Sequence, residues 1–315
     1  MARAHGARSQ MAVAFESTYG TPPGSGFVLL PFATSDLDSQ QALLENELVG
    51  FGRDPLPATQ DAIDVNGTIK VPMDAIGIGY WLKGLFGAPV TTGSSAPYTH
   101  TFNSGGWDLP SLAIEIGMPE VPSFAMHKGN KVNSLTFDVA RKGLLTADVA
   151  LIGQDEVTAS SSAAASPAAV AVQRFNHFNG AISRNGVALG NIVSARFAYS
   201  NNLDPVEVVR GDGLIGGLDP GMAACSGQLV ARFDSTTLLD QARNGEGCTL
   251  AFSYARPGAD DALTFTVRNV RFSRPRREVT GPAGIQISLD WIAGKHTNGA
   301  NAMVTAVLVN SRESY

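Results

Sequence analysis

An internal repeat constrains the fold of this chain more than any other feature of its sequence. Val65–Asp74 and Cys225–Asp234 each contain an early glycine, continue as an apolar–polar alternation, end in aspartate and lead into a helical pattern. Further matches occur in the same order, namely Asp36-Leu37-Asp38 with Asn202-Leu203-Asp204, Asp54-Pro55 with Asp219-Pro220, and Leu135–Val139 with Ile287–Trp291. The separation between counterparts drifts from 166 to 152 residues, as changes in loop length would produce. We interpret the pattern as a tandem duplication.

Both copies contain the same kinds of expected elements. Period-two alternation predicts half-buried strands, and apolar residues three or four positions apart predict one short helix in each copy. Asp74 and Asp234 are the predicted N-caps of these helices, and Gly87 and Gly245 are predicted to end them. The expected strands after the helices are Leu112–Ile116, Ser134–Val139, Leu145–Ile152, Thr249–Tyr254, Leu263–Phe272, Ile285–Ile292 and Met303–Val309. The predicted fold is mainly β (α+β), with two tandem β-sandwich or half-barrel units that each carry one short helix.

Composition places the boundaries between the units. Hydrophobic residues make up 44% of the 315 residues and charged ones only 16%, which allows a sizeable core and leaves much uncharged surface. A low-complexity run of Ala and Ser, broken by Pro167, predicts a linker. We expect an N-terminal arm at 1–25, a first unit at 26–157, the linker at 158–172 and a second unit at 173–315. Phe51–Ile63 and Arg210–Ala224 are expected to be long loops.

Charge and cysteine content limit the classes of function. The net charge of −5 argues against a nucleic-acid-binding protein, because phosphate affinity comes mainly from Lys and Arg. Cys225 and Cys248 form neither a CxxC pair nor a disulfide framework, so we favour a reducing cytosol over a single bridge between them. The N-terminal residues lack an apolar signal core, and no segment approaches the roughly 18 apolar residues of a membrane helix. We expect a soluble, non-exported protein.

Residues that could carry chemistry form no convincing site. The spacing of Gly77, Gly79 and Gly84 does not fit a dinucleotide-binding loop, and packing explains these glycines better. Arg210-Gly211-Asp212 spells an adhesion tripeptide, but a turn is the better account in a glycine-rich loop. The histidines show no metal-ligand spacing, and His100 is expected at a surface or interface. The sequence predicts no enzyme activity, no cofactor and no metal site.

Several short segments, spread over nearly the whole chain, share the order and spacing of a known family. They are Ala12–Pro23, Leu48–Pro55, Val65–Pro72, Tyr98–Phe102, Leu109–Glu115 and Val279–Pro282. In these segments the chain resembles the tail tube (major tail) proteins of long-tailed bacteriophages, in a two-repeat form. The likeness lies in the order of the segments and in no single motif.

The resemblance implies a structural virion protein, made in the cytoplasm of a bacterial host, that stacks as rings into the hollow tail tube through which phage DNA passes. Because single-repeat relatives close rings of six subunits, a two-repeat chain implies trimeric, pseudo-hexameric rings. The implied partners are other copies of the chain and the tape measure, tail terminator and tail tip proteins. Duplex DNA would be present only transiently, without specific binding, and no membrane is implied. The net charge of −5 suits such a conduit, since a basic lumen would retain DNA.

Contacts within and between rings are expected from irregular segments: the N-terminal arm, the Phe51–Ile63 loop and the linker. A basic cluster around Pro275 also contains Arg271. A solvated loop and a contact with acids on the next ring, for example near Glu45 and Glu47, explain this cluster about equally well, and nucleic-acid binding explains it less well. The candidate contact residues are Phe15, Tyr19, Phe51, Arg53, Arg274, Arg276 and Arg277.

Other functions remain as alternatives. A tail-tip or tail adaptor protein would form one ring and would not polymerise. A carbohydrate-binding β-module or a hydrolase is less favoured, because Trp81, Trp107 and Trp291 are too dispersed to suggest a stacking platform.

Overall fold

The computed structural model describes residues 3–276, 284–295 and 302–315 of the chain. Strands dominate, and the α-helices of these residues are α1 (Gly77–Phe86) and α2 (Thr237–Asn244), which confirms the expected mainly β class. The strands are β1 (Gln10–Phe15), β2 (Val28–Leu29), β3 (Thr34–Ser35), β4 (Asp38–Leu44), β5 (Thr59–Pro72), β6 (Val90–Thr92), β7 (Tyr98–Asn103), β8 (Leu112–Met118), β9 (Ser123–Val139), β10 (Thr146–Gly153), β11 (Asp155–Ala159), β12 (Ala168–Ala169), β13 (Gly180–Arg184), β14 (Val187–Ala188), β15 (Ile192–Ser200), β16 (Asp204–Pro205), β17 (Leu218–Asp219), β18 (Ala224–Arg232), β19 (Cys248–Ala255), β20 (Ala262–Phe272), β21 (Gln286–Ile292) and β22 (Val304–Asn310).

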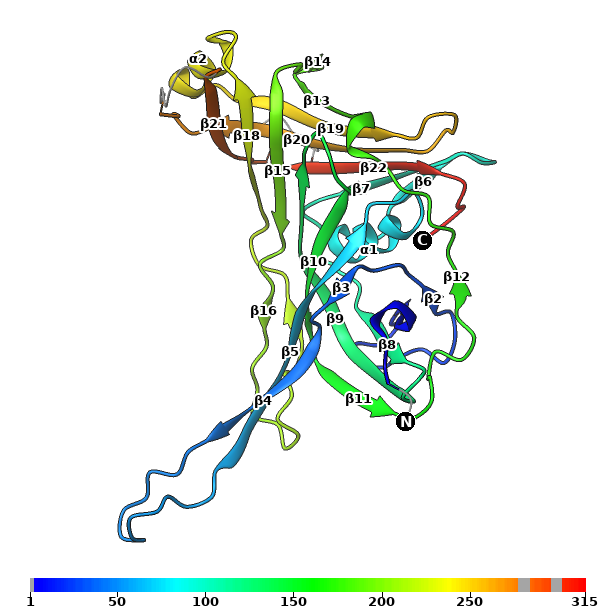
Figure 1. Cartoon of the computed structure of the whole chain (residues 1–315), viewed down its shortest axis with the longest axis vertical. Helices are drawn as coiled ribbons and strands as arrows, with labels where there is room; N and C mark the ends of the chain where they lie inside the picture. The colour runs from blue at the N-terminus through cyan, green and yellow to red at the C-terminus, as the bar shows by residue number, and fades with distance from the viewer. Residues whose placement is uncertain (1–2, 277–283, 296–301) are drawn as a thin grey trace.

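The strands form a central sheet and two flanking sheets that share long strands (Figure 1). The central sheet has the order β4–β5–β10–β9–β15–β18–β21–β20, and β3 also pairs with β5. The first flanking sheet has the order β12–β2–β1–β8–β9–β11. The second has the order β14–β13–β19–β20–β22–β7–β6. Thus β9 and β20 each run from a flanking sheet into the central sheet.

The two halves of the chain repeat the same strand pairings. In the first half β8 pairs with β1 and β9, β9 pairs with β10 and β11, and β5 pairs with β10 and β4. In the second half β19 pairs with β13 and β20, β20 pairs with β21 and β22, and β18 pairs with β21 and β15. A helix follows β5 and β18 alike. The duplication inferred from the sequence therefore has a counterpart in the topology.

The register of the strand pairs shows which residues are equivalent. Three pairs in the first half, Thr34–Lys70, Asp38–Asn66 and Leu44–Thr59, recur in the second half as Ser194–Val230, Ala198–Ser226 and Asp204–Asp219. Each residue lies 160 positions before its counterpart. This register agrees with the match of Val65 to Cys225. It corrects the two upstream matches. Asp36 corresponds to position 196 and not to Asn202, and Asp54 corresponds to position 214 and not to Asp219.

The downstream match of the sequence comparison is also wrong. The segment Ile287–Trp291 lies in β21, which pairs with β18 as β10 pairs with β5. It therefore corresponds to β10 and not to Leu135–Val139 in β9. The error has a simple cause, because both matched segments alternate apolar and polar residues and place an aspartate in the fourth position.

One hydrophobic core includes residues from both halves. At its centre the ring of Phe137 in β9 stacks on that of Phe197 in β15 with centroids 4.9 Å apart, and Phe265 in β20 lies 5.1 Å from Phe137. The same β9 and β15 pair along the central sheet. The two halves are thus joined by a strand pair and by a shared core, and the boundaries at 158 and 172 stay a prediction.

Both helices end at the predicted glycines, whereas Ile76 and not Asp74 occupies the N-cap position of α1. The Asp74 carboxylate accepts hydrogen bonds from the backbone N–H groups of Ile76 and Gly77 at the start of α1. Gly87 (φ 91°) and Gly245 (φ 66°) follow the last helical residues, in the left-handed region that glycine tolerates.

Asp234 was wrongly predicted as an N-cap. Thr236 occupies the N-cap position of α2, and the Asp234 carboxylate instead accepts a hydrogen bond of 2.8 Å from the Asn191 amide. Two residues, Ser235 and Thr236, separate Asp234 from α2, just as Ala75 and Ile76 separate Asp74 from α1, so the two aspartates differ in their hydrogen-bond partners and not in their distance from the helix.

The N-terminal segment is not a free arm, which corrects the expectation for residues 1–25. Residues 10–15 form β1, which pairs along its whole length with β8, and Met11 to Ala14 are buried. Met11 and Val13 join the main core, whereas Ala12 and Ala14 join a smaller cluster on the opposite side of the sheet. Because both sides of β1 are covered, the strand has no apolar–polar alternation.

The Ala/Ser segment 158–172 lies along the first flanking sheet. Its β12 pairs in parallel with β2, and Ala164 is buried in the smaller cluster. The buried Glu115 carboxylate accepts hydrogen bonds from Ser162 Oγ (2.5 Å) and from the N–H of Ala163 (2.6 Å). These contacts make the segment an ordered strap within the chain.

Candidate functional site

The solvent-facing side of the central sheet is mostly polar. Strand residues that point into the core alternate with residues that point to solvent, so this face follows directly from the period-two pattern. The side chains on its middle part are Thr68, Lys70, Ser134, Thr136, Asp138, Asp148, Ala150, Arg196, Ala198, Ser226, Gln228, Ser288 and Asp290.

The cations in the middle of this face lie beside carboxylates. Lys70 Nζ is 2.5 Å from Asp148 Oδ1, and Arg196 Nη1 is 3.9 Å from Asp138 Oδ1. These exposed pairs add little stability, but each cancels a positive charge that would otherwise attract an anion. The middle of the sheet therefore presents a polar face without a stripe of uncompensated cations.

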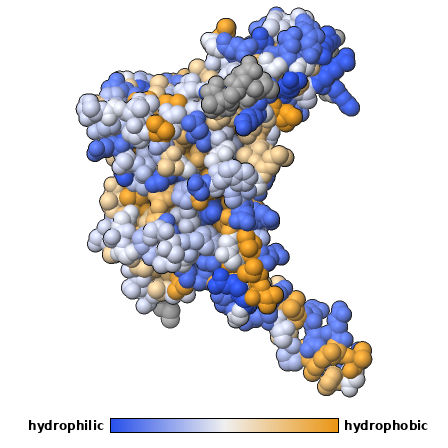
Figure 2. All heavy atoms as spheres, turned by 180° about the vertical axis from the view of Figure 1, so that it is seen from behind, coloured by the Kyte–Doolittle hydropathy of each residue, from blue (hydrophilic) through white to orange (hydrophobic). Residues whose placement is uncertain are grey.

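β4 and β5 form a long arm that projects from the body (Figure 1). Residues 45–58 make its tip. Five large apolar side chains on the arm are between 48% and 91% exposed: Leu43, Leu44, Leu48, Val49 and Phe51. Figure 2 shows these hydrophobic groups along the arm and at its end. Apolar side chains gathered at the end of a projection indicate a surface that another molecule covers.

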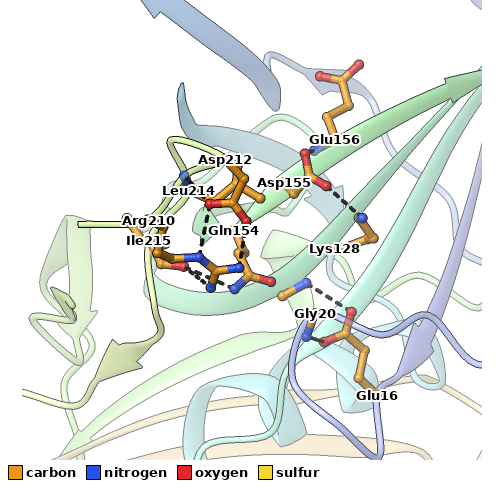
Figure 3. A network of polar contacts seen from close by, with 11 residues as sticks. Glu16, Gly20, Lys128, Gln154, Asp155, Glu156, Arg210, Asp212, Leu214 and Ile215 are labelled. Atoms are coloured by element: carbon orange, nitrogen blue, oxygen red, sulfur yellow. Dashed lines mark hydrogen bonds and ion pairs between the residues drawn. The ribbon is translucent and has the colours of Figure 1, made fainter. Parts of the chain in front are cut away.

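A polar network holds a second loop, residues 206–217, beside the base of the arm (Figure 3). Ile63 N–H in β5 donates to Gly213 O (3.1 Å), and Gln154 Nε2 donates to Ile215 O (3.0 Å). Within the loop, Arg210 donates to both carboxylate oxygens of Asp212, at 3.0 and 2.7 Å. The Arg-Gly-Asp tripeptide is thus closed on itself in a turn, as the sequence suggested.

Two of the predicted contact residues, Phe15 and Tyr19, are half-buried within the chain. The Phe15 ring stacks on Tyr80 with centroids 6.2 Å apart, and Lys83 Nζ lies 4.1 Å above it. Tyr19 lies near Lys131 Nζ, 5.9 Å from the ring centroid, and burial raises the pKa of Tyr19 to about 12. These contacts leave only part of each ring for a neighbouring molecule.

The remaining predicted contact residues lie in two places. Phe51, 64% exposed, and Arg53 are at the tip of the arm. Arg274 and Arg276 are exposed just beyond the end of β20, at the far edge of the central sheet. Arg277 lies outside the described residues. The structure does not bring these two groups together, and their role in contacts stays a prediction.

The two edges of the central sheet carry opposite charges. Among the described residues, β4 has a strand partner only on its β5 side, and the chain beyond Phe272 has no strand partner. Asp36 and Asp38 lie at the β4 edge. The other edge carries the exposed side chains of Arg271, Arg274 and Arg276.

Sequence reasoning misplaced one residue and missed others. His100 is buried, with Nδ1 2.8 Å from Thr91 Oγ1 and Nε2 2.9 Å from Arg312 O, because β7 is covered by the last residues of the chain. Of the apolar groups of the arm, Phe51 was predicted as a contact residue, whereas Leu43, Leu44, Leu48 and Val49 were missed. In the described part of the chain, no helix is both long and apolar enough to cross a membrane.

Comparison with known proteins agrees with this architecture. The chain matches a family model described as phage tail tube protein over residues 6–293. No curated protein gives a significant match. Because the family model spans nearly the whole chain, including the central sheet and its arm, the chain belongs to the phage tail tube protein family, whose members are structural proteins of the phage virion.

Proposed function

We propose that this chain forms trimeric, pseudo-hexameric rings that stack into the hollow tail tube through which phage DNA passes. The observation that supports it most is the pairing of β9 with β15 inside one chain. This pair joins the last central strand of the first half to the first central strand of the second half. The equivalent of β15 in the first half is β4, and the equivalent of β9 in the second half is β20. Both β4 and the end of β20 lie at the outer margins of the chain, so pairing them between chains would repeat this junction.

The internal junction predicts the register of the junction between chains. Within the chain Thr136 pairs with Ala198. Thr136 of β9 corresponds to Arg276, 140 positions later. This offset follows from two equivalent pairs, Lys131–Ile152 in the first half and Arg271–Ile292 in the second, in which each residue of the first pair lies 140 positions before its counterpart. Ala198 corresponds to Asp38. Arg276 of one chain would therefore face Asp38 of the next, and opposite charges at closely spaced strands favour the contact.

Closure of the sheet explains why the edges can be exposed in a single chain. A free strand edge presents unpaired N–H and C=O groups and invites association, and a closed ring removes such edges. Three chains supply the six homologous units that the family's single-repeat rings contain. The polar face of the central sheet, with its paired charges, would then line the lumen and let DNA slide without specific binding.

The arm would make the contacts between rings. Its exposed apolar tip lies far from the polar face of the sheet and projects away from the body (Figure 1). Head-to-tail contacts that do not close produce an open stack, which is the form of a tube. In the virion the tube would also contact the tape measure, tail terminator and tail tip proteins, after synthesis of the chain in the host cytoplasm.

Electron microscopy of the purified protein, combined with charge variants, tests the proposal. Wild-type protein should form striated tubes, whereas Arg276→Asp should form few closed rings because two carboxylates then meet at the junction. The swapped variant Arg276→Asp with Asp38→Arg should restore them. If Arg276→Asp assembles like the wild-type protein, or if the swap restores nothing, the proposed junction is wrong.

A second variant separates stacking from ring closure. Replacing residues 45–58 by a two-residue turn should leave rings intact and abolish tubes, because only the tip of the arm is removed. Isolated rings from the wild-type protein would favour a tail-tip or adaptor role, and monomers would contradict the assembly proposal altogether.

A further inference from the structure

Three side chains with metal-binding atoms meet at the base of the arm. Asp38 comes from β4, His127 from β9 and Glu156 from β11, and one ligand atom of each lies within 4.8 Å of the others. Glu156 is the direct cross-strand neighbour of His127, and its Oε2 is 3.6 Å from His127 Nε2. Asp38 is exposed, so the cluster is open to solvent on the side of the arm.

The His127 ring has one nitrogen satisfied and one without a partner. The residue is 1% exposed, and Nδ1 lies 3.3 Å from the backbone carbonyl of Ile114, which places the ring proton on Nδ1. Nε2 is buried and has no hydrogen-bond partner among the described residues. His100, also fully buried, has partners on both nitrogens. A buried polar atom without a partner is rare in folded proteins.

The cluster places acceptor atoms against one another. With its proton on Nδ1, the His127 ring points the lone pair of Nε2 toward Glu156 Oε2, 3.6 Å away, and Asp38 lies beside them. A cation between these three atoms would satisfy them, because a buried polar atom without a partner is unfavourable.

The second half of the chain shows that the fold does not require this cluster. The register makes Asp38 equivalent to Ala198, His127 to Val267 and Glu156 to Val304. Val267 and Val304 are fully buried, so ordinary apolar packing fills the same place. The polar cluster therefore belongs to the first half alone and is not a demand of the strand pairing.

We propose that Asp38, His127 and Glu156 bind a divalent transition metal of the zinc class. Zinc takes imidazole nitrogen and carboxylate oxygen at about 2.0–2.2 Å, so that two of its tetrahedral ligands lie about 3.3–3.5 Å apart. The His127–Glu156 distance of 3.6 Å is close to this value, and a carboxylate oxygen of the exposed Asp38 lies within 4.8 Å of both ligand atoms. Water would complete the coordination, and the imidazole disfavours magnesium and calcium.

The metal would fasten the arm to the body. Asp38 is the first residue of β4, whereas His127 and Glu156 belong to the first flanking sheet. The Ser39 N–H already donates to Glu156 Oε2 at 2.9 Å, so the two elements touch at this point. A metal bridging them would fix the direction in which the arm leaves the body.

Calorimetric titration of the chelator-treated, unassembled chain with zinc chloride tests the proposal. The unassembled chain is used because Asp38 also lies on the edge proposed to meet the next subunit. One equivalent should bind, a tenfold excess of magnesium should not compete, and the thermal unfolding midpoint should rise with zinc concentration. Hydrogen exchange of residues 38–44 should slow when zinc is added.

The second half supplies the variant that keeps the fold. His127→Val with Glu156→Val copies the packing of Val267 and Val304, and it should fold yet lose zinc binding. Asp38→Asn should weaken binding at least tenfold, whereas His5→Ala, at an exposed histidine, should change nothing. Absence of zinc binding by the wild-type chain, or equal binding by the double valine variant, would overturn the proposal, and neither result bears on ring assembly.

Discussion

Gly227→Ala should destabilise the protein strongly, for a reason visible in the central sheet. A Cβ at this position would lie 2.0 Å from Arg196 O and 2.5 Å from Cζ2 of Trp291, although the backbone of Gly227 is not in the left-handed region. Relief of the first contact requires a displacement of about 1.4 Å, because ordinary van der Waals contact begins near 3.4 Å. The effect of the substitution is therefore steric and not conformational.

The magnitude follows from what has to move. Arg196 lies in β15, which is paired on one side with β18 and on the other with β9, so β15 cannot shift without stretching one of these ladders. Loss of about two backbone hydrogen bonds costs about 2 kcal/mol, and displacement of the buried Trp291 ring adds about 1 kcal/mol or more. We expect a loss of about 3 kcal/mol in the free energy of unfolding.

The equivalent glycine of the first half gives an internal comparison. A Cβ at Gly67 would lie 2.4 Å from Cα of Leu37 and 2.7 Å from Asp36 O. Asp36 and Leu37 lie between β3 and β4, which are paired with β5 on one side only, so this segment can move away at lower cost. Gly67→Ala should therefore cost about 1–2 kcal/mol, less than Gly227→Ala, although the two sites are homologous.

Urea unfolding followed by tryptophan fluorescence measures both variants. Gly190→Ala is the control, because nothing lies within 4 Å of its added methyl group, and it should change stability by less than about 0.5 kcal/mol. The reasoning fails if Gly227→Ala unfolds at the wild-type urea midpoint, or if Gly67→Ala proves the more costly of the two.

Three further predictions concern buried polar groups. Burial, the largest influence on Asp74, raises its carboxyl pKa, so its contribution to stability should fall as the pH rises from about 4 through the folded-state pKa; Asp74→Asn should remove this slope in urea unfolding between pH 4 and 7. Glu115→Ala should cost about 2–4 kcal/mol and speed hydrogen exchange at Ala163 in the strap, whereas unchanged exchange would contradict the anchoring role. Burial raises the pKa of the Cys225 thiol, so iodoacetamide at pH 8 should label it only after unfolding.

Alternation of apolar and polar residues was sufficient to predict strands with one solvent-exposed face. It was insufficient to predict strands that are covered on both faces. Strands such as Ser134–Val139 and Leu145–Ile152 were predicted because their buried residues alternate with polar residues that face solvent, whereas β4 and β15 were not predicted. β1 was assigned to an N-terminal arm, although the uninterrupted apolar residues Met11 to Ala14 are typical of a strand buried on both faces. The small side chains of β1 fit a site between two clusters.

Contacts that depend on register were beyond the sequence. Asp38, His127 and Glu156 are far apart along the chain, and only the pairing of β9 with β11 and the path of the arm bring them together. No spacing rule for metal ligands covers three separate strands. The Asp234 error has the same origin, because Asp234 lies as close to α2 as Asp74 does to α1, but its carboxylate binds Asn191, a partner 43 residues away along the chain.

The two halves have kept one register and diverged at the tips of their hairpins. In the first half the tip, residues 45–58, projects and carries exposed Leu48, Val49 and Phe51. In the second half the equivalent loop lies against the base of that arm, through the hydrogen bond from Ile63 to Gly213. A ring of three such chains would therefore present three projecting arms and not six. Since the arms would make the contacts between rings, stacking would follow threefold symmetry even though the lumen approximates sixfold symmetry, and a ring could be seated on its neighbour in three equivalent orientations only.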